Sequence, residues 1–330
     1  MSVGQTHSEC SVVLVDWGTT NFRLWGVSPF GKVLSHVETG QGMRTLTGNG
    51  FAEVLADQMS SIKIGADTPV IMCGMVGSRQ GWTEAPYIQI PCSLDYIVKN
   101  SVSPPTHDAR NARILPGLAK YDEATPDVMR SEETQLLGLQ NLGLLSAEET
   151  LVCMPGSHAK WVKLKGRSVE NFHTSMTGEL ISVLSTSSVL KHAFHGTASF
   201  PEVSSDDPTF LNAVRYAIEH PSVVLNSVFI TRSRGLLNGE NAQQSAAWLS
   251  GTIIGNDVSA ARLRHADTTA VVLVGGGKQG PLYERALSMA GLSVTEINGA
   301  DAVIAGLAAA AKQIWPQAFY SAEKVEGTAG

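Results

Sequence analysis

The sequence lacks the features that mark membrane, secreted or nucleic-acid-binding proteins. Its apolar runs fall well short of the roughly 20 residues that a membrane-spanning helix needs. Its first ten residues are polar and show no signal-peptide pattern. A net charge of −6 provides no general basic surface for a polyanion. We therefore expect a protein that neither crosses a membrane nor binds nucleic acid.

Cysteine is also scarce, and no two cysteines form a C-x-x-C pair. Two of the four, Cys73 and Cys153, lie in apolar, strand-like runs, where a thiol behaves as a small hydrophobic group. Buried free thiols are therefore favoured over disulfides or a metal site, and a cytoplasmic location is expected. The other two cysteines are Cys10 and Cys92.

Length and composition indicate an ordinary globular protein. The 330 residues correspond to about two domains. With 43% hydrophobic and 16% charged residues, the chain can bury sizeable cores and is not of a disordered class.

The chain is organised around the stretch VVLVDWGTTNFRLW at residues 12–25, which predicts a buried strand, a tight turn and an antiparallel strand. Gly18 has no Cβ, so backbone amides can approach an oxyanion there. Thr19 and Thr20 can donate hydrogen bonds to phosphate oxygens, and Asp16 can hold Mg²⁺ or its water shell. An ordinary hairpin with Asp and Thr side chains capping the turn is the alternative.

A glycine-rich loop at residues 74–82 follows a short apolar strand. It combines the cation Arg79, the amide of Gln80 and the indole of Trp82, a mixture that suits a polar organic ligand with an anionic group. Arg44 follows a glycine in another turn and is a second candidate cation. A surface turn with a solvated Arg79 explains the same composition.

Two adjacent carboxylates open a predicted helix after Ser131. The simplest interpretation is structural: Glu132 and Glu133 follow an N-cap serine and complement the helix dipole. The functional interpretation is that one of them points into a cleft as a general base.

The second half of the chain repeats the opening pattern at residues 151–164. Gly156 and Ser157 take the places of Gly18 and Thr19, so this turn can also hold a phosphate. Met154 stands where the first copy has its acid, so a metal cannot bind in the same way. His158 could reach an anion or cap the turn. Internal duplication explains the repeat, and chance similarity of two hairpins is its rival.

A third glycine turn follows the apolar strand at residues 270–274. Gly275, Gly276 and Gly277 precede a helical run, and strand, glycine turn and helix together form a nucleotide-binding arrangement. The turn lacks both the GxGxxG spacing and a GKS or GKT triplet, which argues against the Rossmann and P-loop interpretations.

These motifs, taken in order, resemble the actin-like ATPase and sugar-kinase superfamily, and more narrowly the 2-dehydro-3-deoxygalactonokinase family. The resemblance extends from residue 16 to about residue 310. The stretches that carry it are DWGTTNFRLW, MCGMVGSRQGW, SEETQLLGL, MPGSHAKWV, TSMTGEL, SRGLLNGE and LVGGGKQGPLYERAL.

The resemblance implies two ribonuclease-H-like α/β domains with ATP and Mg²⁺ in a cleft between them. The expected domains are residues 1–135 on the substrate side and 136–299 on the nucleotide side, with a helix at about 300–320 returning to the first. The expected substrate is a small sugar acid, phosphorylated on its terminal hydroxyl. A homodimer is left open.

The same resemblance assigns roles to residues. Turns 18–20 and 156–158 would hold the phosphates, turn 275–277 the nucleotide, and Asp16 the metal. Glu133, slightly preferred over Glu132, would activate the acceptor hydroxyl. Because a sugar acid carries a carboxylate, its pocket would contain a cation, and we expect Arg79 or Arg44 there, with Gln80 and Trp82 nearby.

One departure and two alternatives accompany this interpretation. The family pattern has glycine before the paired acids where this chain has Ser131, which could alter the loop but spares the carboxylates. The first alternative is a superfamily kinase for another sugar, polyol or sugar acid. The second is a non-catalytic, ATP-dependent clamp of the actin or chaperone type.

Overall fold

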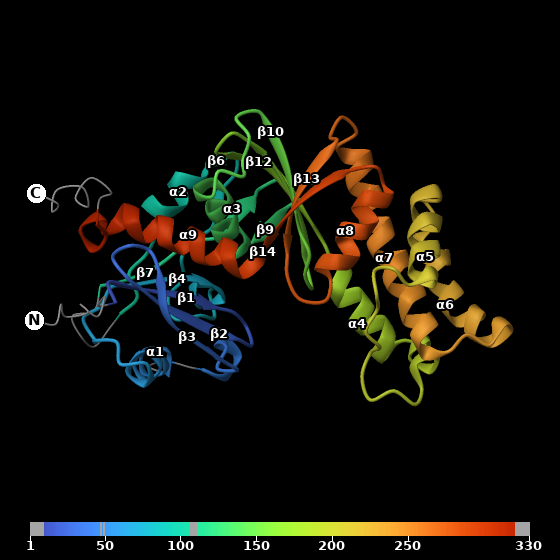
Figure 1. Cartoon of the computed structure of the whole chain (residues 1–330), viewed down its shortest axis with the longest axis horizontal. Helices are drawn as coiled ribbons and strands as arrows, with labels where there is room; N and C mark the ends of the chain where they lie inside the picture. The colour runs from blue at the N-terminus through green and yellow to red at the C-terminus, as the bar shows by residue number, and fades with distance from the viewer. Residues whose placement is uncertain (1–9, 47, 49, 106–110, 321–330) are drawn as a thin grey trace, which may run out of the picture. The chain divides into compact units, whose positions relative to one another are not determined.

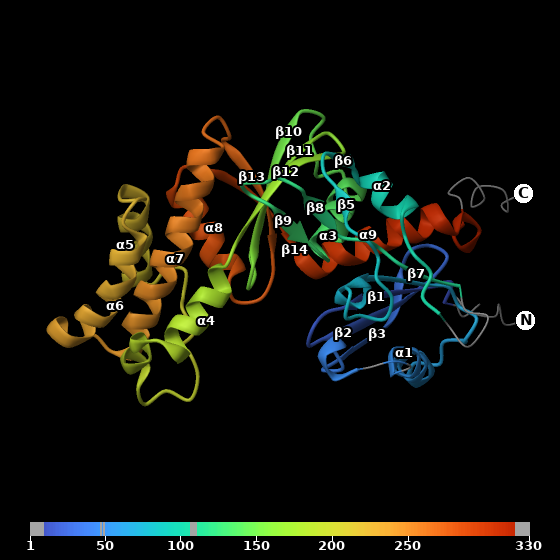
Figure 2. The same ribbon diagram turned by 180° about the vertical axis from the view of Figure 1, so that it is seen from behind.

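A computed structural model of the chain describes residues 10–46, 48, 50–105 and 111–320. Over these residues the chain forms two compact units (Figures 1 and 2). Unit 1 comprises the described residues up to Leu145, the segment Arg167–Val169 and the described residues from Ala300 onward. Unit 2 comprises Ser146–Gly166 and Glu170–Gly299.

The central sheet of unit 1 has the strand order β3-β2-β1-β4-β7 within the described residues. Its first three strands are antiparallel neighbours, and the last two continue the sheet in parallel. All six residues of β1 are buried, as expected of a strand that is covered on both faces. The strands are β1 (Val12–Trp17), β2 (Phe22–Val27), β3 (Val33–Thr39), β4 (Val70–Gly74) and β7 (Ala112–Ile114).

Helix α1 (Gly50–Ser61) covers one face of this sheet (Figure 1). Its Phe51 and Leu55 join a core with Val13, Val15 and Trp17 of β1. Because side chains alternate across a strand, Asp16 of β1 belongs to the opposite face. A smaller sheet of β5 (Ile88–Gln89), β8 (Leu118–Lys120) and β9 (Asp127–Met129), the strand β6 (Cys92–Ser93) and helix α2 (Leu94–Lys99) complete this part of unit 1.

Helices α3 (Glu132–Asn141) and α9 (Gly299–Ile314) lie side by side in both views (Figures 1 and 2). A Cβ at Gly138 would overlap the carbonyl oxygen of Ala302, and one at Gly306 would overlap that of Thr134. The helices therefore approach to backbone contact where each has a glycine. The domain boundary expected after residue 135 would fall inside α3, which unit 1 contains whole.

Unit 2 repeats the strand order of unit 1. Its sheet runs β12-β11-β10-β13-β14, so in both units the third, second, first, fourth and fifth strands are neighbours in that order. The shared topology supports the internal duplication. The strands are β10 (Glu149–Met154), β11 (Ala159–Lys165), β12 (Ser168–Ser175), β13 (Ala270–Gly275) and β14 (Ser293–Asn298); Ser168 and Val169 of β12 pair with β6.

The long helix α7 (Ala242–Arg264) forms the centre of the unit 2 core. Helix α5 (Pro208–Glu219) packs against it closely, because a Cβ at Gly251 would stand 2.6 Å from the carbonyl oxygen of Phe210. The remaining helices are α4 (Thr177–Ser187), α6 (Val224–Asn238) and α8 (Gly280–Met289), and short 3-10 segments occupy Met43–Thr45, Met75–Gly77, Val189–Phe194 and Pro316–Ala318.

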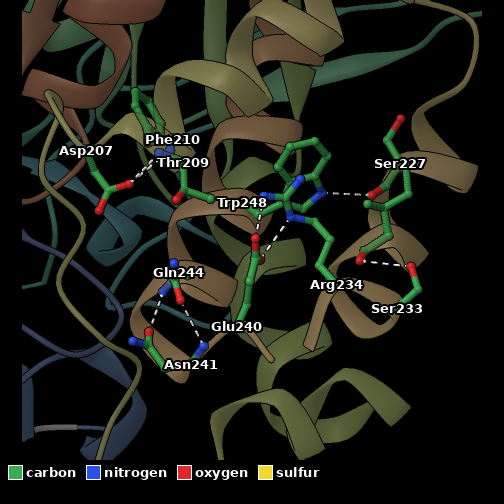
Figure 3. Close-up of polar contacts among 11 residues, drawn as sticks. Asp207, Thr209, Phe210, Ser227, Ser233, Arg234, Glu240, Asn241, Gln244 and Trp248 are labelled. Atoms are coloured by element: carbon green, nitrogen blue, oxygen red, sulfur yellow. Dashed lines mark hydrogen bonds and ion pairs between the residues drawn. The ribbon is translucent and has the colours of Figure 1, made fainter. Parts of the chain in front are cut away.

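Polar contacts attach α6 to α7 (Figure 3). The guanidinium of Arg234 forms two hydrogen bonds with the carboxylate of Glu240 and lies 4.1 Å from the ring centroid of Trp248. The Trp248 indole donates in turn to the carbonyl oxygen of Ser227, at 3.3 Å. The Arg234 guanidinium therefore takes part in both an ion pair with Glu240 and a cation–π contact with Trp248.

Candidate phosphate and acceptor sites

The first phosphate turn, residues 18–20, is held in place by hydrogen bonds from a second segment to its carbonyl groups. The carbonyl oxygens of Gly18, Thr19 and Thr20 accept from the amides of residues 43, 44 and 42, respectively. A Cβ at Gly42 would overlap the Thr20 backbone, so glycine is required for this approach. Among the described residues, the amides of Thr19 and Thr20 have no acceptor, which leaves them available to an oxyanion.

The second phosphate turn has the same support in unit 2. The amides of Gly178 and Glu179 donate to the carbonyl oxygens of Gly156 and Ser157, at 3.2 and 3.1 Å. A Cβ at Gly178 would stand 2.7 Å from the Gly156 carbonyl oxygen, so a glycine again permits the contact. His158 is exposed, and its Nε2 forms an ion pair with the carboxylate of Glu179. The carbonyl groups of this turn are therefore held by a second segment, as in the first turn.

The third glycine turn joins the same part of unit 2. A Cβ at Gly178 would also stand 2.7 Å from the side-chain nitrogen of Gln279, which precedes α8. Gly276 and Gly277 are exposed, with no atom within 4 Å of a Cβ built on either, and Gly277 has a φ of +58° that favours glycine. The predicted phosphate and nucleotide turns of unit 2 are thus neighbours in space.

A buried carboxylate in α7 ties the segments around these turns together. Asp257 accepts from the indole of Trp161 at 3.1 Å, from the hydroxyls of Ser175 and Thr177, and from the phenol of Tyr283. Burial raises the pKa of Asp257, and these four donors oppose that rise. Asp257 was not predicted as a site residue, since a lone acid inside an apolar helix carries no local motif.

In unit 1, Asp16 lies at the end of β1 with 6% of its surface exposed. Its carboxylate forms an ion pair with Arg23, its register partner on β2, and accepts a weak hydrogen bond from the Cys73 thiol at 3.8 Å. Burial raises the pKa of Asp16, while the Arg23 guanidinium acts in the opposite direction. Arg23 was not among the predicted site residues, although antiparallel pairing across the turn could have indicated it.

Glu133 is fully buried in the first turn of α3. Burial raises the pKa of the Cys73 thiol, and the carboxylates of Asp16 and Glu133 raise it further. Its Oε1 accepts from the Ser131 amide and the Thr134 hydroxyl, both at 3.2 Å, and its Oε2 has no hydrogen-bond partner. Burial, and then the nearby charge of Glu132, raise the pKa of Glu133 to about 8. Such a carboxyl group suits proton transfer near neutral pH.

Residue 131 has a backbone conformation that favours glycine. Ser131 has a φ of +94°, and its Oγ would stand 3.0 Å from a Cβ at Gly74, where β4 ends. Ser131 is not a side-chain N-cap of α3, contrary to the sequence expectation, because the positive φ turns its hydroxyl away from the helix amides. Glu132 is only half-buried and accepts from the Arg130 amide at 3.0 Å.

The predicted substrate residues occupy different environments. Arg79 is 82% exposed and 3.8 Å from Glu84, and Gln80 and Arg44 are also exposed. Trp82 is partly buried, stacks parallel to Phe51 with ring centroids 6.2 Å apart, and contacts the core of unit 1. A ligand can therefore reach the side chains of Arg79, Arg44 and Gln80. Trp82 instead packs against the core of unit 1 and anchors the loop there.

A second arginine that was not predicted as a site residue, Arg130, packs against this loop. Arg130 is 9% exposed, donates to the Ala85 carbonyl oxygen at 2.9 Å and lies 4.4 Å from the Tyr87 ring centroid. Its Nε and Nη1 atoms are buried without a hydrogen-bond partner. A Cβ at Gly77 would stand 2.9 Å from Nη1, so the loop lies directly on the guanidinium.

The residues of the first phosphate turn fit a divalent cation whose other ligands are phosphate and water. The described residues contain no group of three or more His, Cys, Asp or Glu side chains that could hold a metal alone. Mg²⁺ in phosphoryl-transfer sites needs only one or two carboxylates, since phosphates and water supply the other ligands. In unit 1, Asp16 could provide such a carboxylate, and the amides of Thr19 and Thr20 suit phosphate oxygens.

Comparison with known families decides the relationship. The profile of the 2-keto-3-deoxy-galactonokinase family matches residues 16–310. This chain belongs to that family. The predicted family is confirmed, and with it the predicted enzyme class: the family is one of kinases, phosphotransferases that use ATP and an alcohol acceptor.

Individual relatives agree with the family. The curated protein "Probable 2-dehydro-3-deoxygalactonokinase DgoK1" of Rhizobium meliloti (strain 1021) is 43% identical over 302 residues, which cover 92% of this chain and 97% of the relative. The 2-dehydro-3-deoxygalactonokinase of Escherichia coli (strain K12) is 33% identical over 295 residues, covering 89% and 95% of the two chains.

Solved structures show the fold. A crystal structure described as a candidate 2-dehydro-3-deoxygalactonokinase protein from Sinorhizobium meliloti matches with a TM-score of 0.88 and 42% identity, covering 92% of this chain and 99% of the other. A ligand-bound xylulose kinase from Lactobacillus acidophilus matches with a TM-score of 0.50 and 10% identity, covering 92% and 89%. The predicted α/β, actin-like sugar-kinase fold is confirmed.

Proposed function

We propose that this protein transfers the γ-phosphoryl group of ATP to the C6 hydroxyl of 2-dehydro-3-deoxy-D-galactonate, as a step of galactonate catabolism. The single observation that supports this substrate most strongly is family membership over residues 16–310. The names of two relatives that align over nearly their whole length point to the same substrate. The residues supply the chemistry, because phosphoryl transfer depends on charge neutralisation and alignment more than on covalent catalysis.

The proposed roles follow from the environments of the residues. Glu133, with its unpartnered Oε2, is the proposed acceptor-activating carboxylate, and Glu132 is the alternative. Asp16 is the proposed Mg²⁺ ligand, directly or through water, and the cation would neutralise phosphate charge. Arg79 is the proposed anchor of the sugar-acid carboxylate, because an exposed guanidinium can bind a carboxylate through two parallel hydrogen bonds.

A cytoplasmic location is part of the proposal. All four cysteines are free in the structure, as expected for a reducing compartment. In the part of the chain that the structure describes, no helix has both the length and the apolar character needed to span a bilayer.

A substrate screen tests the proposed activity. Purified protein with MgATP is offered 2-dehydro-3-deoxy-D-galactonate, its epimeric keto acid, related aldonic acids, polyols and neutral hexoses, and ADP formation is followed. We expect the galacto-configured keto acid to have the highest kcat/KM and the product to carry phosphate on C6 by NMR. Efficient phosphorylation of a neutral sugar instead would support the broader superfamily kinase. ATP hydrolysis that no sugar acid stimulates would support the clamp.

A further inference from the structure

The donors around Asp257 occupy both oxygens of its buried carboxylate. Its Oδ1 accepts from the Trp161 indole at 3.1 Å and from the Ser175 hydroxyl. Its Oδ2 accepts from the Thr177 hydroxyl at 3.3 Å and from the Tyr283 phenol. An ionised carboxylate has about four acceptor positions, whereas the single oxygen of an amide has about two. The position therefore requires an aspartate rather than its neutral isostere.

Three of these donors lie on segments that adjoin the proposed nucleotide turns. Trp161 belongs to β11, which begins directly after turn 156–158. Thr177 is the first residue of α4, and the amide of the next residue donates to a carbonyl oxygen of that same turn. Tyr283 belongs to α8, which follows turn 275–277. One side chain thus connects the segments that carry both turns.

Helix α7 holds the Asp257 carboxylate on a firm base. A Cβ at Gly251 would stand 2.6 Å from the carbonyl oxygen of Phe210, and one at Gly255 would stand 3.0 Å from the Cα of Val214. Helix α7 therefore packs on α5 at backbone distance just before Asp257. The carboxylate is fixed by a helix that carries neither turn, and the segments with the turns attach to it.

We propose that Asp257 is a positioning residue for nucleotide binding, which fixes turn 156–158 and turn 275–277 relative to each other within unit 2. This inference rests on the proposed function, in which these turns hold the nucleotide. Asp257 acts through its partners: Trp161 and Thr177 orient the phosphate turn, and Tyr283 orients α8 behind the glycine turn. Because binding groups must be held within about 0.5 Å of their productive geometry, losing these bonds should lower affinity even in a folded protein.

The affinity of the folded protein tests this role. Calorimetry, well below the unfolding temperature, measures the Kd of full-length wild type and Asp257→Asn for adenosine and for MgATP, and circular dichroism confirms the fold. The asparagine oxygen can accept from only part of the donor set. We expect both ligands to bind about tenfold more weakly or worse, because buried hydrogen bonds to a charged group are lost.

Two further variants each remove one donor and keep the carboxylate. Tyr283→Phe releases α8, so adenosine and MgATP should both bind more weakly. Thr177→Val releases the segment that holds the phosphate turn, so MgATP should bind more weakly while the Kd for adenosine stays constant. Residues that only support the fold would not divide their effects by ligand. These variants also test the role of Asp257 if Asp257→Asn does not fold.

Val214→Ala is the matched control for lost stability. Val214 is a fully buried, apolar residue of α5 that packs on α7, so its truncation leaves a cavity in the same core. We expect Val214→Ala to lower the melting temperature and to leave the Kd for both ligands unchanged.

The outcomes separate this inference from the proposed function. A wild-type protein that binds no nucleotide contradicts both. If wild type binds MgATP and the folded variants at Asp257, Tyr283 and Thr177 bind it equally tightly, the positioning role alone is overturned. Equal losses of affinity in Asp257→Asn and Val214→Ala would also overturn it, because the effect would then reflect general destabilisation of unit 2.

Discussion

Arg23 lies directly opposite Asp16 across the β1–β2 ladder, and its guanidinium forms an ion pair with the Asp16 carboxylate. A buried carboxylate without a bound metal needs such a partner, because uncompensated burial of a charge is costly. A magnesium ion that binds Asp16 must therefore compete with Arg23 or share the carboxylate with it. The proposed metal role of Asp16 therefore depends on how Arg23 shares that carboxylate.

Replacing Asp16 should nearly abolish turnover while the fold is kept. Asp16→Asn removes the acid at the first phosphate turn, and we expect kcat to fall by about 10²-fold or more, since metal stabilisation of the phosphoryl group contributes several kcal/mol. Steady-state kinetics over a Mg²⁺ titration, with circular dichroism of the variant, provide the measurement. Glu38→Gln is the control, because exposed Glu38 lies on the other side of Arg23. Near-normal turnover in folded Asp16→Asn would exclude the metal role.

Neutralising Glu133 should lower kcat far more than affinity for ATP. A general base typically contributes about 10²–10⁴-fold, and Glu133→Gln keeps the shape without the basicity. In the wild type, kcat/KM should rise with pH as Glu133 loses its proton, with the midpoint near its pKa of about 8. In Glu133→Gln that rise should disappear.

Glu132→Gln is the matched variant for this experiment. Glu132 is half-buried in the same helical turn, and it is the alternative base. If Glu132→Gln carries the loss of kcat instead, the two roles are exchanged. If both variants keep full kcat, the carboxylates only complement the α3 dipole.

The buried Glu133 should also make stability depend on pH. Its pKa rises from an ordinary 4.5 to about 8 on folding, so the folded state binds the proton more tightly than the unfolded state. The stabilisation is complete below pH 4.5 and is lost as pH rises through 8. At about 1.36 kcal/mol per unit, the 3.5-unit difference between 8 and 4.5 corresponds to about 5 kcal/mol.

Urea unfolding of wild type and Glu133→Gln at several pH values measures this effect. We expect the variant to be more stable than wild type above pH 8 and to lose that advantage as pH falls toward 5. A constant difference between the two proteins across this range would show that Glu133 keeps one ionisation state in both folded and unfolded chains.

Ser131→Gly should stabilise the protein. Ser131 has a φ of +94°, a region that costs a non-glycine residue of order 1–3 kcal/mol. Glycine removes that strain but gains freedom in the unfolded chain, so we expect a net gain of about 1 kcal/mol, read as a higher midpoint in urea. The matched variant Ser131→Ala keeps the strain and should not be stabilised. A destabilised Ser131→Gly would indicate that the serine hydroxyl outweighs the strain.

Replacing Arg79 in the glycine-rich loop should weaken use of the sugar acid without changing the affinity for MgATP. Arg79→Ala should lower kcat/KM for 2-dehydro-3-deoxy-D-galactonate by about tenfold or more, because a charged hydrogen bond is lost, while the Kd for MgATP stays constant. Arg79→Lys keeps the charge without the planar fork and should be impaired to a smaller degree. Arg44→Ala tests the second candidate in the same assay. An unchanged kcat/KM in Arg79→Ala would remove Arg79 from the substrate site.

Much of the fold was predictable because its signals are local. The apolar runs around Asp16 and Gly156 are short, are flanked by turn residues and pair with the next segment along the chain, so hairpin and turn follow from adjacent residues. The glycine turn at 275–277 likewise follows its strand directly. The expected N-cap role of Ser131 was wrong because its backbone has a positive φ, and its side chain makes no capping hydrogen bond.

The sequence by itself determined the hairpins, the three glycine turns, the family and the residue types available for phosphoryl transfer, since each depends on neighbouring residues. Only the tertiary structure decided how those groups are held. Asp16 and Glu133 acquire raised pKa values because folding buries both carboxylates around Cys73, and Gly42 and Gly178 support the phosphate turns from segments more than 20 residues away. The role of Asp257 as a shared hydrogen-bond acceptor emerged in the same way. Desolvation and backbone contact between distant segments arise only in the folded chain, so no local pattern records them.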